Sequence, residues 1–294
     1  MKITLLQQDI CWANPTENKR RTEVAILNAP SSDLYVLPEM WNTGFGNPDS
    51  LIAHGYNYEQ DDSLGWMKSM AERLDCAIAG SISVKAEDGT YRNRLYFVTP
   101  SDTYFYDKHH LFSYGNEHLA YTAGDNRTIV EWRGVKFLLQ ICYDLRFPCF
   151  SRNGATLAYC SEKGIDNAHD CNAFAQDSHI PADVADCVSA HNSNTPSYDY
   201  DCAIYVASWP TSRLDVWRTL LKARALENQC YVVGVDRTGK DPNCSYSGGT
   251  CAFNAYGKTV AECQDDTVMS CTFDLNMTRL YAFREKFPVL MDRR

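Results

Sequence analysis

The sequence predicts a mixed α/β protein in which helices and strands form separate layers. Short apolar runs that suit buried strands alternate with segments whose apolar residues recur every three or four positions, the spacing of one helix face. In addition, Asp88-Gly89 separates two strand-like runs at 77–84 and 93–98, which is a hairpin signal. Strands that alternate with helices and include hairpins are typical of layered α/β folds.

The N-terminal part of the chain supplies two expected helices and several strands. A helix is expected over about 16–28, because Thr16 can cap it and Glu17 suits its first turn. Asp62 or Ser63 can cap a second helix, whose apolar residues lie three and four positions apart. The strands expected in this part are 2–7, 34–37, 77–84 and 93–98.

The C-terminal part continues the alternation. The run 135–141 is continuously apolar, as in a strand buried on both faces, and 202–209 is similar. A further strand is expected at 231–235, and 247–253 and 268–273 have β character. Between the second and third of these strands, one helix face is marked by Leu214, Trp217, Leu220, Leu221 and Ala225.

Composition and charge exclude several classes of protein. Of 294 residues, 45% are hydrophobic and 22% are charged, the balance of a soluble globular chain. The net charge of −9 does not favour a nucleic-acid partner, since phosphate binding needs a basic surface. The sequence shows neither the apolar core of a signal peptide nor a membrane-spanning run. We therefore expect a cytoplasmic protein with no membrane partner, whose 13 scattered cysteines are reduced.

One segment, at about 154–197, does not fit this pattern. Its apolar periodicity fades, and it carries one lysine against six acidic residues. We interpret it as a surface insertion in a single domain that spans 1–294, because added loop length costs little. An erroneously translated segment is the alternative. Its histidines and cysteines raise a zinc hypothesis, but Cys160, Cys171 and Cys187 lack the close pairing of structural zinc sites. A metal site is therefore not expected.

Three separated stretches carry residues that could perform chemistry. Glu39 lies just past an expected strand, Lys108 follows a strand-like run with Glu117 nine residues later, and Cys142 ends the apolar run 135–141. A cysteine nucleophile needs a base for its proton, and the oxyanion formed on a carbonyl substrate needs nearby donors. A carboxylate, a lysine and a backbone N–H would supply these groups. Each residue also has an ordinary interpretation, as a small core cysteine, a solvated glutamate or a surface lysine.

The same stretches resemble a known family. PEM at 38–40, YDKHHLF at 106–112 and ICYDLRFP at 141–148 are similar to the Glu, Lys and Cys signatures of the nitrilase superfamily of carbon–nitrogen hydrolases. The similarity extends over most of the chain. PEM with TGF, CYDLRFP and ASWP together resemble the omega-amidase branch. That branch hydrolyses the terminal amide of 2-oxo-dicarboxylic acid monoamides such as 2-oxoglutaramate.

The resemblance implies a fold, an assembly and a set of roles. It implies a four-layer α-β-β-α sandwich that forms a homodimer and needs no metal or organic cofactor. It implies Cys142 as nucleophile, Glu39 as general base and Lys108 as oxyanion stabiliser. The backbone N–H of Tyr143 would also hold the oxyanion, and Glu117 would orient the site beside Lys108.

An omega-amidase substrate carries a distant carboxylate, which calls for a cation. Arg146, just after the cysteine turn, and Arg213, just after the strand at 202–209, are candidates. Phe45, Tyr114 and Trp209 are candidates for the pocket wall. Structural ion pairs and plain core packing are the alternatives for these five residues.

Three other functions compete with the omega-amidase hypothesis. A different amidase or a nitrilase of the same superfamily would differ in its pocket wall. A non-catalytic assembly or metal-binding protein, defined by its insertion, would not require Glu39, Lys108 and Cys142 together. A redox thiol protein is disfavoured because the chain has no C-x-x-C pair.

Overall fold

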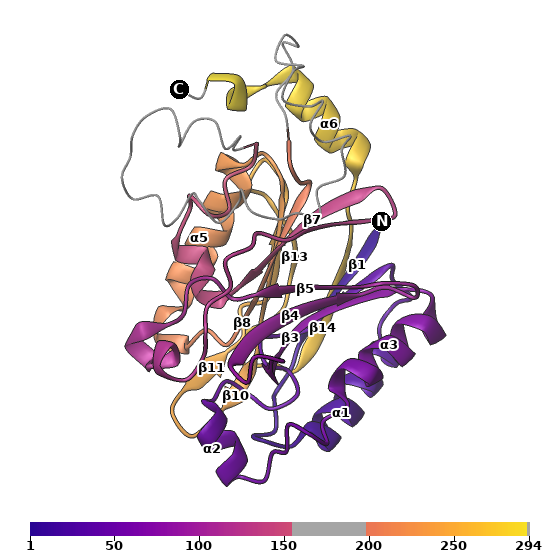
Figure 1. Ribbon diagram of the computed structural model, residues 1–294. Coiled ribbons are helices and arrows are strands. Elements are labelled where there is room, and N and C mark those ends of the chain that lie inside the picture. Colours follow the sequence, from indigo (N-terminus) through magenta and orange to yellow (C-terminus); the bar gives the residue numbers. More distant parts are fainter. Residues whose placement is uncertain (155–197, 293–294) are drawn as a thin grey trace.

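Two six-stranded sheets pack face to face, and helices cover the outer face of each sheet (Figure 1). The computed structural model describes residues 1–154 and 198–292. The four layers are, in order, one layer of helices, the first sheet, the second sheet and a second layer of helices. The expected four-layer α-β-β-α sandwich is therefore confirmed.

The first sheet has the strand order β14-β1-β2-β3-β4-β5. Its three central strands β1, β2 and β3 are parallel, whereas β14, β4 and β5 pair antiparallel to their neighbours. The hairpin expected at Asp88-Gly89 joins β3 to β4, and Gly89 adopts a positive φ of 81° there. The strands are β1 Lys2–Gln7, β2 Leu34–Val36, β3 Ala77–Lys85, β4 Tyr91–Val98, β5 Thr103–Asp107 and β14 Met269–Asp274.

The second sheet has the order β13-β12-β9-β8-β7-β6. Strands β7, β8 and β9 are parallel and buried between the first sheet and a helix, which explains their continuous apolar runs. The strands are β6 Ile129–Trp132, β7 Val135–Ile141, β8 Cys202–Ala207, β9 Tyr231–Asp236, β12 Cys251–Phe253 and β13 Thr259–Glu262. A separate ribbon pairs β10 Thr238–Lys240 with β11 Ser245–Ser247.

Helices α1 Pro15–Asn28 and α3 Ser63–Leu74 pack on the first sheet, and α5 Leu214–Glu227 packs on the second. All three were expected, α1 from its capping residues and α3 and α5 from the spacing of their apolar residues. Two further helices, α2 Pro48–Ala53 and α6 Met277–Lys286, were not. Both are short, and their sequences lack a long apolar stripe.

The N-terminus of α1 differs from the expectation. Asn14, not Thr16, caps the helix, and its side-chain oxygen accepts a hydrogen bond from the Glu17 N–H at 3.1 Å. Pro15 takes the first helical position, where a missing N–H costs nothing. The helix therefore begins one residue earlier than expected. In α3, the cap position is Asp62, one of the two expected residues.

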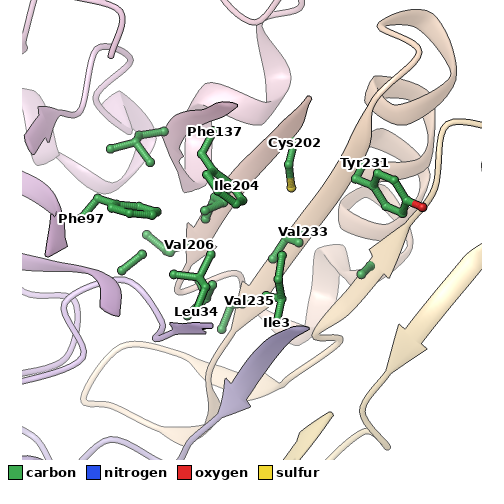
Figure 2. Close-up of a cluster of buried hydrophobic side chains, with 14 of the residues drawn as sticks. Ile3, Leu34, Phe97, Phe137, Cys202, Ile204, Val206, Tyr231, Val233 and Val235 are labelled. Carbon is green, nitrogen blue, oxygen red and sulfur yellow. The ribbon is translucent and has the colours of Figure 1, made fainter. Parts of the chain in front are cut away.

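The largest core cluster lies between the two sheets (Figure 2). Phe97 from β4 and Phe137 from β7 meet there with ring centroids 5.5 Å apart, and both side chains are fully buried. Branched aliphatic side chains fill the remaining space. The labelled examples are Ile3 and Leu34 from the first sheet and Ile204, Val206, Val233 and Val235 from the second.

The parallel strands of both sheets end at the same edge of the sandwich. Asp9, just after β1, forms a parallel bridge with Thr238, just after β9. The segment after β2 likewise contacts the segment after β8, because the Ser208 N–H donates to the Glu39 side chain. Residues that follow β2, β7, β8 and β9 are therefore brought together although they are far apart in the chain.

The expected insertion at about 154–197 lies outside the described residues except for Gly154. Cys160, Cys171 and Cys187, to which the zinc hypothesis applied, also lie outside the described residues. Within 1–154 and 198–292, no helix has the length and apolar character needed to cross a membrane.

Phe137→Ala tests the contribution of the inter-sheet core. We expect a loss of about 3–5 kcal/mol in the free energy of unfolding, because a buried ring is removed and a cavity remains. Phe287→Ala is the matched control, since that side chain is 57% exposed, and it should cost less than about 1 kcal/mol. Urea unfolding of both variants measures the difference. Equal losses would contradict this account of the core.

Candidate active site

A buried lysine lies between two buried carboxylates at the edge where the strands end. The Lys108 Nζ is 2.9 Å from an oxygen of Glu39 and 2.9 Å from an oxygen of Glu117, and all three side chains are at most 1% exposed. Glu39 follows β2, Lys108 follows β5, and Glu117 begins the short 3-10 helix Glu117–Leu119. The structure therefore brings together three of the residues that the sequence analysis singled out.

Burial and charge act against each other in this cluster. Burial by itself disfavours the ammonium form of Lys108, but Glu117 and Glu39 outweigh it, so the pKa of Lys108 lies above its ordinary value. Burial raises the pKa of Glu117, and the nearby Glu39 raises it further, while Lys108 opposes both effects. The lysine thus remains a cation that is fixed between two acids.

Asn93 completes the cluster, and sequence reasoning missed it. Its Nδ2 donates to Glu39 at 2.8 Å and to Glu117 at 3.1 Å, and its backbone oxygen accepts from the Lys108 N–H. Asn93 lies inside β4 and is 1% exposed. A signal was present, because asparagine is depleted in strands and a polar residue on a buried strand needs partners.

Glu39 is fixed from a second side. Its Oε2 accepts from the Ser208 N–H at 2.8 Å, while its Oε1 accepts from Lys108. The next residue, Met40, has a positive φ of 44°, and its N–H donates to the Ser81 hydroxyl at 2.9 Å. A non-glycine residue with this φ is strained, so surrounding bonds must hold it. The Glu39 carboxylate therefore has little rotational freedom.

Cys142 lies at a sharp turn directly after β7. Its φ is 46°, in the left-handed region, and it begins the 3-10 helix Cys142–Arg146. The buried Asp144 pins this turn, because its oxygens accept from the Ile141 N–H and the Tyr106 hydroxyl on one side and from His110 on the other. These bonds, each 2.8–2.9 Å long, offset the strain at the cysteine.

The cysteine is partly exposed and strongly influenced by the charged cluster. Burial of the thiol raises its pKa well above the ordinary value, Glu39 raises it further, and Lys108 opposes this shift. The free protein therefore holds Cys142 chiefly as the thiol at neutral pH. Tyr143 follows in the first turn of the short helix, where N–H groups have no intrahelical acceptor. The arrangement suits a nucleophile that loses its proton to a nearby base when it attacks.

Aromatic side chains and two arginines surround the cysteine turn. Arg146 lies over the Trp209 ring at 5.1 Å, and Arg213 lies over the Phe112 ring at 5.4 Å. Neither arginine forms a salt bridge within the described part of the chain. Tyr143 contacts Phe112 with ring centroids 5.1 Å apart. The sequence analysis had assigned both arginines to this region.

The three aromatic candidates differ in their positions. The Phe45 ring lies 5.3 Å from the Lys108 Nζ, and Trp209 is buried, with its indole N–H donating to the Arg213 carbonyl. Tyr114 is 85% exposed, and its ring lies beside that of Phe112 at a tilted angle, with the ring centroids 5.9 Å apart. Phe45 therefore contacts the charged cluster and Trp209 contacts Arg146 of the cysteine turn, whereas Tyr114 is mostly exposed to solvent.

Within the residues that the structure describes, no group of three or more His, Cys, Asp or Glu side chains is arranged to hold a metal ion. Lys108 instead occupies the space between the carboxylates. Cys142, Glu39 and Lys108 are side chains that can supply nucleophilic attack with acid–base support.

Comparison with known proteins gives a consistent result. The carbon-nitrogen hydrolase family model matches residues 2–176 and 197–284. Among curated proteins, the omega-amidase YafV of Escherichia coli strain K12 is 37% identical over 294 residues, which cover 99% of this chain and 96% of YafV. The 2-oxoglutaramate amidase of Bacillus subtilis is 30% identical over 299 residues, with 99% and 97% covered.

A solved structure agrees in fold. XC1258 from Xanthomonas campestris is a CN-hydrolase superfamily protein whose crystal structure has an arsenic adduct in the active site. It matches with a TM-score of 0.81 and 32% identity, over 100% of this chain and 97% of XC1258.

The raised thiol pKa gives a pH prediction. Because burial and Glu39 disfavour the thiolate, the alkylation rate of Cys142 by iodoacetamide should still rise with pH above about 9, where that of a free cysteine derivative levels off. Mass spectrometry of the Cys142 peptide measures this rate. A plateau near pH 8 would contradict the electrostatics described above.

Proposed function

The chain belongs to the carbon–nitrogen hydrolase family, and on that premise we propose that it is an omega-amidase. It hydrolyses the terminal amide of a 2-oxo-dicarboxylic acid monoamide, such as 2-oxoglutaramate, to the acid and ammonia. The observation that carries the proposal is the buried Glu39–Lys108–Glu117 cluster beside the strained Cys142 turn. Full-length similarity to an omega-amidase and to a 2-oxoglutaramate amidase supports the choice of substrate class.

In the first half of the reaction, Cys142 is the nucleophile and Glu39 is the general base. Glu39 takes the thiol proton as the sulfur attacks the amide carbon, which avoids the cost of a buried thiolate before substrate is present. The C–S bond forms, and the carbonyl π electrons move onto oxygen. The tetrahedral intermediate collapses, Glu39 returns the proton to nitrogen, and ammonia leaves a thioester on Cys142.

Lys108 and the backbone N–H of Tyr143 stabilise the oxyanion. An ammonium group that is already desolvated and held by two carboxylates needs little reorganisation as charge develops on the substrate. Glu117 and Asn93 do not contact the reacting atoms in this scheme. They orient Lys108 and Glu39, which is supported by the hydrogen bonds that Asn93 donates to both glutamates.

In the second half, water replaces ammonia. The oxygen of the water attacks the thioester carbon while Glu39 accepts a proton from that water. Lys108 and the Tyr143 N–H stabilise the second oxyanion as they did the first. Collapse breaks the C–S bond, the thiolate regains its proton from Glu39, and the dicarboxylic acid leaves. The Ser208 N–H and Lys108 keep the Glu39 side chain in one orientation through both halves.

The distal carboxylate of the substrate binds Arg146 and Arg213. Both guanidinium groups lie over aromatic rings, and within the described chain neither is engaged by an acidic side chain. A carboxylate ligand would complete their hydrogen bonding. Phe45 and Trp209 form the apolar wall of the pocket, and Tyr114 belongs to its outer rim.

The proposal also includes the compartment and the assembly. We expect a cytoplasmic homodimer. The ten cysteines of the described residues are all free thiols, which fits a reducing compartment. Phe105 on the edge strand β5 is 49% exposed, and an apolar ring at a free sheet edge suits burial in an interface.

Cys142→Ala tests the chemistry. Ammonia release from 2-oxoglutaramate and from succinamate should fall to background in this variant, because no thioester can form, while the melting temperature changes little. The matched control is Cys149→Ala, an exposed thiol in the next turn, which should keep wild-type rates. Retained turnover in Cys142→Ala would remove the proposed mechanism. A wild-type protein that hydrolyses another amide but neither of these two would remove the omega-amidase assignment alone.

Substitution of the arginines tests substrate recognition. Arg146→Gln and Arg213→Gln should each raise KM for 2-oxoglutaramate about 10–100-fold, the loss expected for one charge-assisted hydrogen bond. Hydrolysis of butyramide, which lacks the distal carboxylate, should change less than about threefold. If both amides lose activity equally, the arginines act on the reaction or the fold rather than on the carboxylate.

A further inference from the structure

Asp236 is a buried acid at the edge of the site that the mechanism above does not use. It is the last residue of β9, opposite Ala207 at the end of β8, and its side chain is fully buried. Its Oδ1 accepts from the Trp209 N–H and from the Arg237 N–H, each at 2.8 Å. Its backbone N–H and carbonyl are both bonded to the Thr250 hydroxyl. The residue is therefore rigidly placed.

The second side-chain oxygen of Asp236 has no hydrogen-bond partner among the described residues and almost no contact with solvent. An ionised carboxylate would leave negative charge on this oxygen, in a buried place with Glu39 nearby. Such a buried charge is strongly unfavourable unless a cation pairs with it. The neutral acid avoids that cost.

The neighbouring cation does not pair with this oxygen. The Arg237 side chain is buried, but it donates to the carbonyls of Thr238, Ile10 and Lys240 and lies near Asp9. The charged groups that act on Asp236 are Arg237, which favours its ionisation, and Glu39, which opposes it. Together with burial of the carboxyl, which is the larger effect, they leave the pKa of Asp236 well above its ordinary value.

Asp236 and Glu39 hold consecutive N–H groups of one turn. The Ser208 N–H donates to the Glu39 Oε2 at 2.8 Å, and the next N–H along the chain, that of Trp209, donates to the Asp236 Oδ1. The direction of the Ser208 N–H is therefore set in part by the bond that Asp236 makes with its neighbour. Loss of that bond would free the turn, and Glu39 would lose a fixed donor.

We propose that Asp236 is a positioning residue, which fixes the Ser208–Trp209 backbone so that Glu39 stays aligned with Cys142, and that it acts as an uncharged carboxyl group. The inference rests on the proposed function, because it assumes that Glu39 is the general base. An uncharged group is also what the site requires, since an ionised Asp236 would oppose a negative charge on the Cys142 sulfur.

Two variants separate the two parts of this proposal. Asp236→Asn keeps an oxygen acceptor for the Trp209 and Arg237 N–H groups and carries no charge at any pH. Asp236→Ala removes the acceptor. Asp201→Asn is the matched control, because Asp201 is also a buried acid but lies just before β8, at the far end of that strand, where it pairs with Arg284 at 2.7 Å.

The first readout is steady-state hydrolysis of 2-oxoglutaramate. Asp236→Ala should lose about 10–100-fold in kcat with a smaller change in KM, as expected when a catalytic group is misplaced. Asp236→Asn should stay within about threefold of wild type in kcat. Asp201→Asn should lower the melting temperature but leave kcat per folded protein unchanged. Wild-type kcat in Asp236→Ala would overturn the positioning role, and equal losses in both Asp236 variants would overturn the uncharged state.

The second readout is the pH profile of Cys142 alkylation, which needs no substrate. If Asp236 is uncharged, the profiles of wild type and Asp236→Asn should superimpose through the neutral range, as should that of Asp201→Asn. A profile displaced to lower pH in Asp236→Asn alone would show that wild type carries a charge there, and would overturn the proposal. If Asp236→Ala does not fold, this comparison still decides the charge state.

The two readouts also distinguish failure of this inference from failure of the proposed function. A wild-type protein that shows no Cys142-dependent ammonia release defeats the proposed function, whatever the Asp236 variants do. Active wild type with unaffected Asp236→Ala defeats only the inference about Asp236.

Discussion

The site depends on one buried interaction, the bond of the Lys108 ammonium to Glu39 and Glu117. Three titratable side chains with almost no solvent contact can be buried together only because the Lys108 cation lies between the two acids. Asn93 and the backbone N–H groups of Phe112 and Ser208 also donate hydrogen bonds to the two carboxyl groups. Removing Lys108 would leave two buried acids with no cation between them. This requirement explains why Glu39 and Glu117 accept so many hydrogen bonds. In the proposed mechanism, it also means that Lys108 is in place to donate to the developing oxyanion before substrate arrives.

The sandwich makes this interaction possible. Glu39 and Lys108 follow strands of the first sheet, whereas Cys142 and Ser208 follow strands of the second. Close packing of the two sheets through Phe97 and Phe137 fixes the separation between these strand ends. The core therefore bears on the proposed function, because a shift of one sheet against the other would separate Glu39, the proposed base, from Cys142, the proposed nucleophile.

Strain at the site is offset by neighbouring hydrogen bonds. Cys142 and Met40 both have positive φ angles, which cost free energy for residues other than glycine. Asp144 pins the first turn and Ser81 holds the second. The acidic residues near Cys142 therefore make different contacts. Glu39 and Glu117 bind the Lys108 ammonium, Asp144 holds the Cys142 turn, and Asp236 accepts hydrogen bonds from backbone N–H groups.

Most of the strands, three of the helices and the strand ends at which Glu39, Lys108 and Cys142 lie could be predicted from the sequence, because apolar periodicity and local motifs are properties of neighbouring residues. The short strands β6, β10 and β13 were not predicted. It placed the cap of α1 at Thr16 instead of Asn14, since several polar residues near a helix start can serve and packing selects one. The tertiary structure alone reveals that Asn93 joins the two glutamates, that the Ser208 N–H donates to Glu39, that Asp236 accepts from the Trp209 N–H, and that Tyr114 is mostly exposed to solvent. These residues acquire their partners from segments up to 169 positions away, and no local pattern specifies such contacts.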